Sequence, residues 1–210
     1  MNKFTTTLCI ATMLLTTGAM AGWSGPIVAD FEGLDTPNDD PDDIIESYGF
    51  FSQHAGLSWY CPEASGGDYQ ACVYVPNGSD NGYTYGVTSG EQAFFSPWAS
   101  SVEISLDGGG LWNMESVWIN AAWDDALTVV FQGFRSGAVV AESEHVLSHW
   151  SIVELITFGG GFHDIDTLTV SSQGGHFTMD DFTYSVPAPG AIAVLGLAGL
   201  AAQRRRRRSP

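Results

Sequence analysis

Basic residues are almost missing from the central part of this 210-residue chain. Between residues 22 and 186 only Arg135 is basic, whereas all 24 Asp and Glu fall in this stretch and leave it a formal charge of −23. Nucleic-acid binding needs clustered Lys and Arg against the phosphate backbone, so the composition excludes nucleic acid as a partner. It leaves open whether the acids serve solubility in a salty medium or bind divalent cations.

The N-terminus contains a short apolar run rather than one of membrane-spanning length. Lys3 precedes the largely apolar residues 8–15, and Ala-Met-Ala follows at residues 19–21. A basic residue, a short apolar segment and a small-x-small site in this order are typical of a secretory signal peptide. We therefore expect signal peptidase to remove residues 1–21, so that the mature chain begins at Gly22.

The C-terminus combines a short apolar segment with a basic block. Residues 190–202 contain only Gly, Ala, Val, Ile and Leu. As a helix they would be about 20 Å long, short of the roughly 30 Å hydrocarbon core of a bilayer. The block that follows consists of Arg204, Arg205, Arg206, Arg207 and Arg208. It is typical of a stop-transfer signal that stays cytoplasmic, which places the body on the far side of the membrane.

A proline motif, Pro187-Ala188-Pro189, precedes this segment and completes a three-part tail at residues 187–210. The tail resembles the PEP-CTERM sorting signal, although Ala188 replaces the central acid of that family's Pro-Glu-Pro motif. The resemblance implies an exosortase-type protease that removes the tail near Pro187. It also implies delivery to the cell surface or to an extracellular polysaccharide matrix. A plain membrane anchor without cleavage is the alternative.

Cysteine is scarce, and only Cys61 and Cys72 remain once the signal peptide with Cys9 has left. Two cysteines in an exported chain most simply form one disulfide. A Cys61–Cys72 bridge would close a short loop and stabilise the fold by roughly 3 kcal/mol in the chain-entropy model.

Helical periodicity is nearly absent from residues 22–186. Short alternating runs, broken by Gly, Asn, Asp and Ser, take its place. The main runs are 27–32, 56–60, 72–75, 83–87, 92–96, 101–106, 114–123, a run from 127 to the turn at 136–137, 138–146, 151–158, 165–171 and 176–184. The pattern predicts an all-β domain at residues 22–186, a two-sheet antiparallel β-sandwich of the jelly-roll type. A signal helix and a short membrane helix would flank it.

Three sequence segments of the body resemble the jelly-roll domains of PEP-CTERM proteins and, more distantly, carbohydrate-binding jelly rolls. They are Ala-Asp-Phe-Glu at 29–32, Trp-Asp-Asp-Ala-Leu-Thr-Val at 123–129 and Met-Asp-Asp-Phe at 179–182. In such domains a structural calcium often sits where the first and last strands meet.

The acids at these two strands form a candidate metal site. If the first and last strands lie side by side, four carboxylates come together, namely Asp30, Glu32, Asp180 and Asp181. Calcium prefers such oxygen ligands, so we expect a structural Ca²⁺ held by some of them, with ordinary turn and surface acids as the alternative. Alternation in residues 177–184 also breaks at the paired aspartates, where a β-bulge would re-aim a carboxylate.

Aromatic residues are abundant and suggest a platform on which sugar rings could stack. The candidates are Trp59, Tyr60, Tyr83, Tyr85 and Trp98. Aromatic side chains are also the usual filling of a sandwich core, and that alternative stays open.

Signals for catalysis are lacking, since the chain contains neither a Gly-x-Ser-x-Gly elbow nor a His-Glu-x-x-His motif. We therefore expect a noncatalytic exported protein of the cell surface or extracellular matrix. The alternatives are a carbohydrate-binding module for extracellular polysaccharide and a polysaccharide-degrading enzyme.

Overall fold

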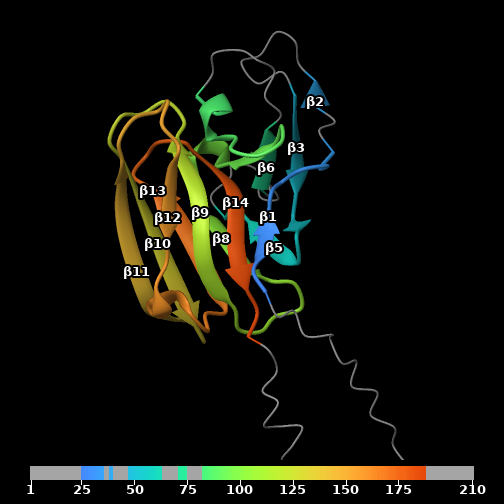
Figure 1. Ribbon diagram of the computed structural model, residues 1–210, viewed down its shortest axis with the longest axis vertical. Helices are drawn as coiled ribbons and strands as arrows, with labels where there is room; N and C mark the ends of the chain where they lie inside the picture. Colours follow the sequence, from blue (N-terminus) through green and yellow to red (C-terminus); the bar gives the residue numbers. More distant parts are fainter. Residues whose placement is uncertain (1–24, 36–37, 40–46, 63–70, 75–81, 188–210) are drawn as a thin grey trace, which may run out of the picture.

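Two antiparallel sheets packed face to face form the body of the protein (Figure 1). The computed structural model describes residues 25–35, 38–39, 47–62, 71–74 and 82–187. The expected signal segment at 1–21 and the expected tail helix lie outside this part of the chain. No helix within it is long and apolar enough to cross a membrane. The prediction of an all-β, two-sheet antiparallel sandwich is confirmed.

The larger sheet has eight strands, in the order β12-β9-β14-β7-β6-β3-β2, with β1 paired to β14. Its strands are β1 (Ile27–Ala29), β2 (Asn38–Asp39), β3 (Ser47–Phe51), β6 (Ala71–Tyr74), β7 (Ala93–Phe95), β9 (Asn113–Ala121), β12 (Glu154–Thr157) and β14 (Phe177–Ser185). The smaller sheet has six strands, in the order β11-β10-β13-β8-β5-β4. Its strands are β4 (Gln53–His54), β5 (Leu57–Tyr60), β8 (Val102–Leu106), β10 (Leu127–Arg135), β11 (Ala138–Leu147) and β13 (Thr167–Ser172).

Within the described residues, three short 3-10 turns connect the strands, namely η1 (Thr84–Gly86), η2 (Pro97–Ala99) and η3 (Gly160–Phe162). The strand expected at 83–87 is therefore wrong, because η1 occupies this stretch and packs on β9 and β14 instead of joining a sheet. Gly86 makes this approach possible: a Cβ atom at its position would lie 1.7 Å from Thr178 Oγ1.

Aromatic rings fill one end of the core between the two sheets. Phe31 lies at the centre, with its ring centroid 5.2 Å from that of Trp59 and 6.0 Å from that of Phe51. Trp59 also meets the ring of Phe182 edge to face, at 5.3 Å. These rings come from the first strands and from the last, so burial of their apolar surface holds the two ends of the domain together.

The first and last strands lie side by side, as the metal-site hypothesis assumed. Strand β1 runs antiparallel to β14, with Ala29 opposite Phe182. The register of β14 against β9 shifts between Asp180 and Thr183, and Asp181 has a positive φ of 45°. This is the expected β-bulge, and the extra residue returns the following side chains to the core. The core-facing residues on both sides of the bulge are Phe177, Met179, Phe182 and Tyr184.

Candidate functional site

The aspartates of the bulge bind a loop of the protein itself. Asp180 is fully buried, and its Oδ2 accepts hydrogen bonds from the backbone N–H groups of Thr88 at 2.6 Å and Ser89 at 2.9 Å. The Thr88 hydroxyl donates to the same oxygen at 2.9 Å, and the Ser89 hydroxyl donates to Asp181 Oδ1 at 2.9 Å. Burial raises the pKa of Asp180, and these donors oppose the shift.

Glu32, which follows the first strand, contacts the same loop. Glu32 Oε1 accepts hydrogen bonds from the backbone N–H groups of Glu91 at 2.7 Å and Gln92 at 2.8 Å. Gly90, with φ of +55°, leaves room for this carboxylate, since a Cβ there would lie 2.2 Å from Glu32 Cδ. Asp30 is half-exposed and lies 3.9 Å from His54 Nε2.

Three of the four acids, Glu32, Asp180 and Asp181, thus accept hydrogen bonds from residues 88–92. Asp30 instead accepts a hydrogen bond from the backbone N–H of Glu32 at 3.2 Å. In the described stretches, no group of three or more His, Cys, Asp or Glu side chains is placed to hold a metal ion. Asp180 Oδ1 is also engaged, by the backbone N–H of Asp181 at 2.7 Å. The calcium site stays a prediction, and this geometry does not supply its ligand cage.

The structure differs from the sequence prediction at the expected disulfide. Cys61 carries a free, buried thiol, and that burial raises its pKa to about 12. Cys61 follows β5 of the six-stranded sheet, whereas Cys72 lies on β6 of the eight-stranded sheet. Their closeness in sequence therefore does not make them neighbours on one sheet, and the Cys61–Cys72 bridge is not formed.

The aromatic candidates divide into buried and exposed residues. Trp59 and Tyr83 are buried, so neither ring offers a face to a sugar. Tyr85 is half-buried and packs edge to face against Trp150, with the ring centroids 5.0 Å apart. Tyr60 and Trp98 are 48% and 55% exposed. Only these last two have the exposure that a stacking platform requires.

The outer face of the eight-stranded sheet is covered over its central strands. Asn120 on β9, together with Thr178 and Asp180 on β14, points away from the core yet is fully buried. On one side, η1 and the loop at 88–92 cover this face. On the other side Trp150 covers it, and the backbone oxygen of Trp150 accepts a hydrogen bond from Asn120. This face is therefore closed to a large ligand where its polar side chains lie.

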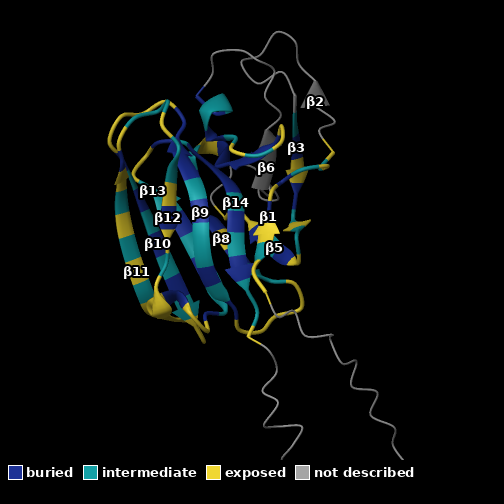
Figure 2. Cartoon of the chain, in the orientation of Figure 1, coloured by how far each residue is buried: buried dark blue, intermediate teal, exposed yellow. Residues whose placement is uncertain are grey.

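The outer face of the six-stranded sheet is open. Along β8, β10 and β13, buried residues alternate with half-buried or exposed ones that face outward. The colours of Figure 2 mark the burial class of each residue. Two cross-strand rows follow from the register, Glu103–Thr169–Gln132 and Ser105–Thr167–Phe134. At one end of β5, Tyr60 lies opposite Glu103 and extends the first row. We call the surface formed by Tyr60, Glu103, Gln132, Phe134, Thr167 and Thr169 the open face.

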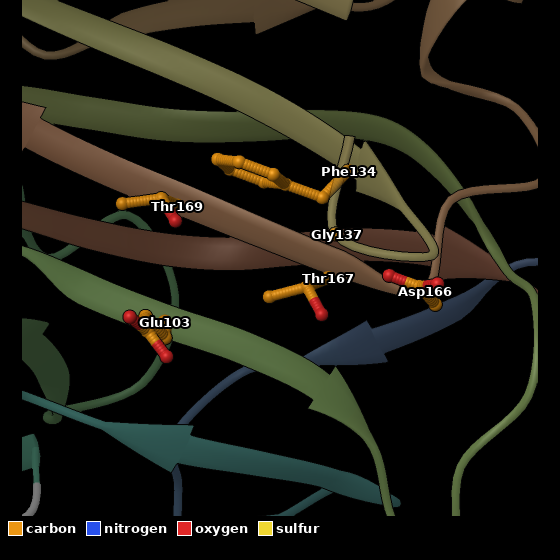
Figure 3. Close-up of a pocket in the computed structure, with 6 residues that line it drawn as sticks. All are labelled: Glu103, Phe134, Gly137, Asp166, Thr167 and Thr169. Atoms are coloured by element: carbon orange, nitrogen blue, oxygen red, sulfur yellow. The ribbon is translucent and has the colours of Figure 1, made fainter. Parts of the chain in front are cut away.

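A hollow of about 150 Å³ lies on the open face. Figure 3 shows its lining residues, which are Glu103, Phe134, Gly137, Asp166, Thr167 and Thr169. In this view Thr167 lies between the carboxylates of Glu103 and Asp166. Asp166 is held in place because its Oδ2 accepts the backbone N–H of Ser136 at 2.5 Å and its own N–H donates to Phe134 O at 2.8 Å.

The hollow combines an aromatic ring, two hydroxyl groups and two carboxylates. Such a mixture of one apolar surface with a few convergent polar groups is typical of small-molecule sites, although this hollow is smaller than the roughly 300–1,000 Å³ of most of them. It suits a single unit of a longer ligand that lies across the sheet. The sequence candidates did not include its lining residues. The signal was present in the alternation of strands β8, β10 and β13, but alternation does not say which sheet face stays open.

No protein-family model matches the chain, and no curated protein is similar to it at a significant level. Among solved structures, a DUF4465 family protein from Bacteroides caccae is 11% identical, with a TM-score of 0.53, over 76% of this chain and 98% of that one. A DUF4465 family protein from Bacteroides ovatus is 7% identical, with a TM-score of 0.43, over 77% and 94%. The structure of TmCBM61 in complex with β-1,4-galactotriose is 14% identical, with a TM-score of 0.35, over 67% and 88%. The first of these shows a shared fold.

Proposed function

We propose that this protein is a noncatalytic exported protein that binds extracellular polysaccharide through the open face. The observation that supports the proposal is the hollow in which Phe134 lies beside Thr167, with Glu103 and Asp166 at the same site. A sugar ring offers an apolar face to an aromatic side chain and hydroxyl groups to carboxylate and hydroxyl acceptors. The covered outer face of the other sheet leaves the open face as the broad surface for such a ligand.

Replacing Phe134 by alanine tests this site. We expect the variant to bind polysaccharide roughly two- to tenfold more weakly, because an aromatic contact contributes roughly 0.5–1.5 kcal/mol. The measurement is retention of the protein in gels that contain a panel of neutral and charged polysaccharides. Leu155→Ala, which removes an exposed apolar side chain from an edge strand of the other sheet, is the matched control and should keep full retention. If the native protein is not retained by any polysaccharide, the proposal is wrong.

Trp98 offers an internal check on the location of the site. It is exposed, but it lies in η2 rather than on the open face. If Trp98→Ala rather than Phe134→Ala weakens retention, the ligand binds near η2 and the open face is not the site.

A polysaccharide-degrading enzyme is the second candidate, and one observation favours it. Glu103 and Asp166 line the same hollow, and pairs of carboxylates carry out most glycoside hydrolysis. Release of reducing ends from a retained polysaccharide, abolished by Glu103→Gln and by Asp166→Asn, would establish this activity. Retention without release would leave the noncatalytic function in place.

Export and sorting by the C-terminal tail belong to the same proposal. The supporting features are the signal-type segment at 1–21, the Pro187-Ala188-Pro189 motif and the terminal arginines. We expect the mature protein to run from Gly22 to near Pro187 and to be found outside the membrane. Mass spectrometry of membrane and extracellular fractions measures this directly. A product that keeps the arginine block and occurs only in membranes would show a membrane-anchored protein that is not processed.

A further inference from the structure

We infer that the polysaccharide bound by the open face contains amino sugars whose protonated amines lie at Glu103 and Asp166. This inference rests on the proposed function and names the class of ligand that the same hollow takes. It follows from the charges that line the hollow, from the partners those charges have, and from the position of the nearest basic residue.

The two carboxylates of the hollow differ in how they are held. Asp166 accepts one backbone hydrogen bond, from Ser136, and is thereby fixed at the rim. Glu103 is exposed on β8, and no described residue donates a hydrogen bond to it or forms an ion pair with it. The other lining residues, Phe134, Gly137, Thr167 and Thr169, carry no charge. The hollow therefore has two negative charges and no positive one.

The nearest basic group does not compensate this charge. Arg135 ends β10 next to the hollow, but its Nε and Nη2 donate to the backbone oxygens of Asp164 at 2.5 Å and His163 at 3.0 Å. Its guanidinium also lies 3.8 Å from the Asp164 carboxylate. Since Arg135 is the only Lys or Arg between residues 22 and 186, the body offers no other basic side chain for this site.

A hollow lined by charges of one sign concentrates counter-ions and repels ligands of the same sign. Separate ammonium groups of the ligand would meet Glu103 and Asp166, because Thr167 lies between these two carboxylates (Figure 3). A sugar ring would lie against Phe134, and its hydroxyls would meet Thr167. Chains rich in uronate or sulfate would instead bring further negative charge to a body of formal charge −23. The ligand class with the best charge complementarity is thus an amino polysaccharide with free amines.

Two oligosaccharides that share a backbone provide the test. Oligomers of glucosamine and of N-acetylglucosamine, equal in length, differ at one substituent of each unit, which is an amine that can be protonated in the first and a neutral acetamide in the second. We expect the native protein to bind the glucosamine oligomer several-fold more tightly in isothermal titration at low salt. The preference should shrink as salt is added, because exposed charges are screened.

Variants of the hollow should remove the preference stepwise. Glu103→Gln and Asp166→Asn should each lower the glucosamine preference by roughly two- to fivefold, as for an exposed ion pair, and the double variant should abolish it. Asp124→Asn with Asp125→Asn is the matched control, because it removes two exposed charges from the turn before β10. That turn lies roughly 25 Å from the hollow along the strand, and the control should keep the full preference.

Three other results of these binding experiments would each contradict the inference. An equal loss in the control variant would show general attraction to an acidic protein rather than a site. Equal binding of both oligomers, or binding only of neutral polysaccharides, would overturn the amine requirement while the proposed function stands. Absence of binding to any polysaccharide would remove the proposed function and this inference together.

Discussion

Replacing Trp59 by alanine is expected to lower the free energy of unfolding by about 3–5 kcal/mol, which is the largest effect of any single change considered for this domain. Trp59 is 1% exposed, and its ring packs against those of Phe31 and Phe182. Truncation leaves a cavity between the two sheets, and the surrounding rings can fill it only in part. Urea denaturation followed by far-UV circular dichroism measures the change.

The neighbouring residue provides the control for this prediction. Tyr60 follows Trp59 on β5 but points to the open face and is 48% exposed. Tyr60→Ala should change stability by less than about 1 kcal/mol, in line with surface substitutions. If the two variants unfold at the same urea concentration as the native protein, the assignment of Trp59 to the core is wrong. A fully folded Trp59→Ala variant that has lost polysaccharide binding would restore the stacking role predicted from the sequence.

Replacing Asp180 by alanine is expected to destabilise the protein by about 2–4 kcal/mol. The substitution leaves the partly buried backbone N–H groups of Thr88 and Ser89 without their buried acceptor, and an unsatisfied donor that stays buried costs roughly 1–3 kcal/mol. The loop at 88–92 should also loosen from the sheet. Limited proteolysis should then cut near Thr88 faster in the variant than in the native protein, and urea denaturation gives the loss of stability.

A more conservative variant separates the hydrogen bonds from other effects of the change. Asp180→Asn keeps one oxygen that can accept from Thr88 and Ser89, so it should lose less stability than Asp180→Ala. Equal losses would show that the charge, rather than the acceptor, is what matters at this position. That result would also favour a bound cation over the hydrogen-bonded loop.

The strand pattern and its interruption could be predicted from the sequence. Alternation with period two predicts strands, and frequent turn residues between short strands predict an antiparallel sandwich. Within residues 177–184 the change of alternating face at Asp180-Asp181 was enough to predict the bulge. The pairing of the first strand with the last, which the metal-site hypothesis assumed, is present in the structure.

The roles of those acids could not be predicted in the same way. Glu32 and Asp180 bind backbone N–H groups from residues 88–92, which lie far from both in the chain. Which donors a carboxylate meets depends on the path of a loop, and a residue pattern within one strand does not record that path. The free thiol of Cys61 was missed for a similar reason, since closeness in sequence does not say on which strands and sheets two cysteines lie.

The sequence by itself determined the all-β class, the sandwich, the bulge and the strongly acidic body, because these follow from local alternation and from composition. Only the tertiary structure decided that Trp59 and Tyr83 are buried, and that the outer face of one sheet is covered while that of the other is open. Alternation divides the residues of a strand between two faces of a sheet. Which outer face meets solvent depends on η1 and the loop at 88–92, which cover one sheet and leave the outer face of the other exposed.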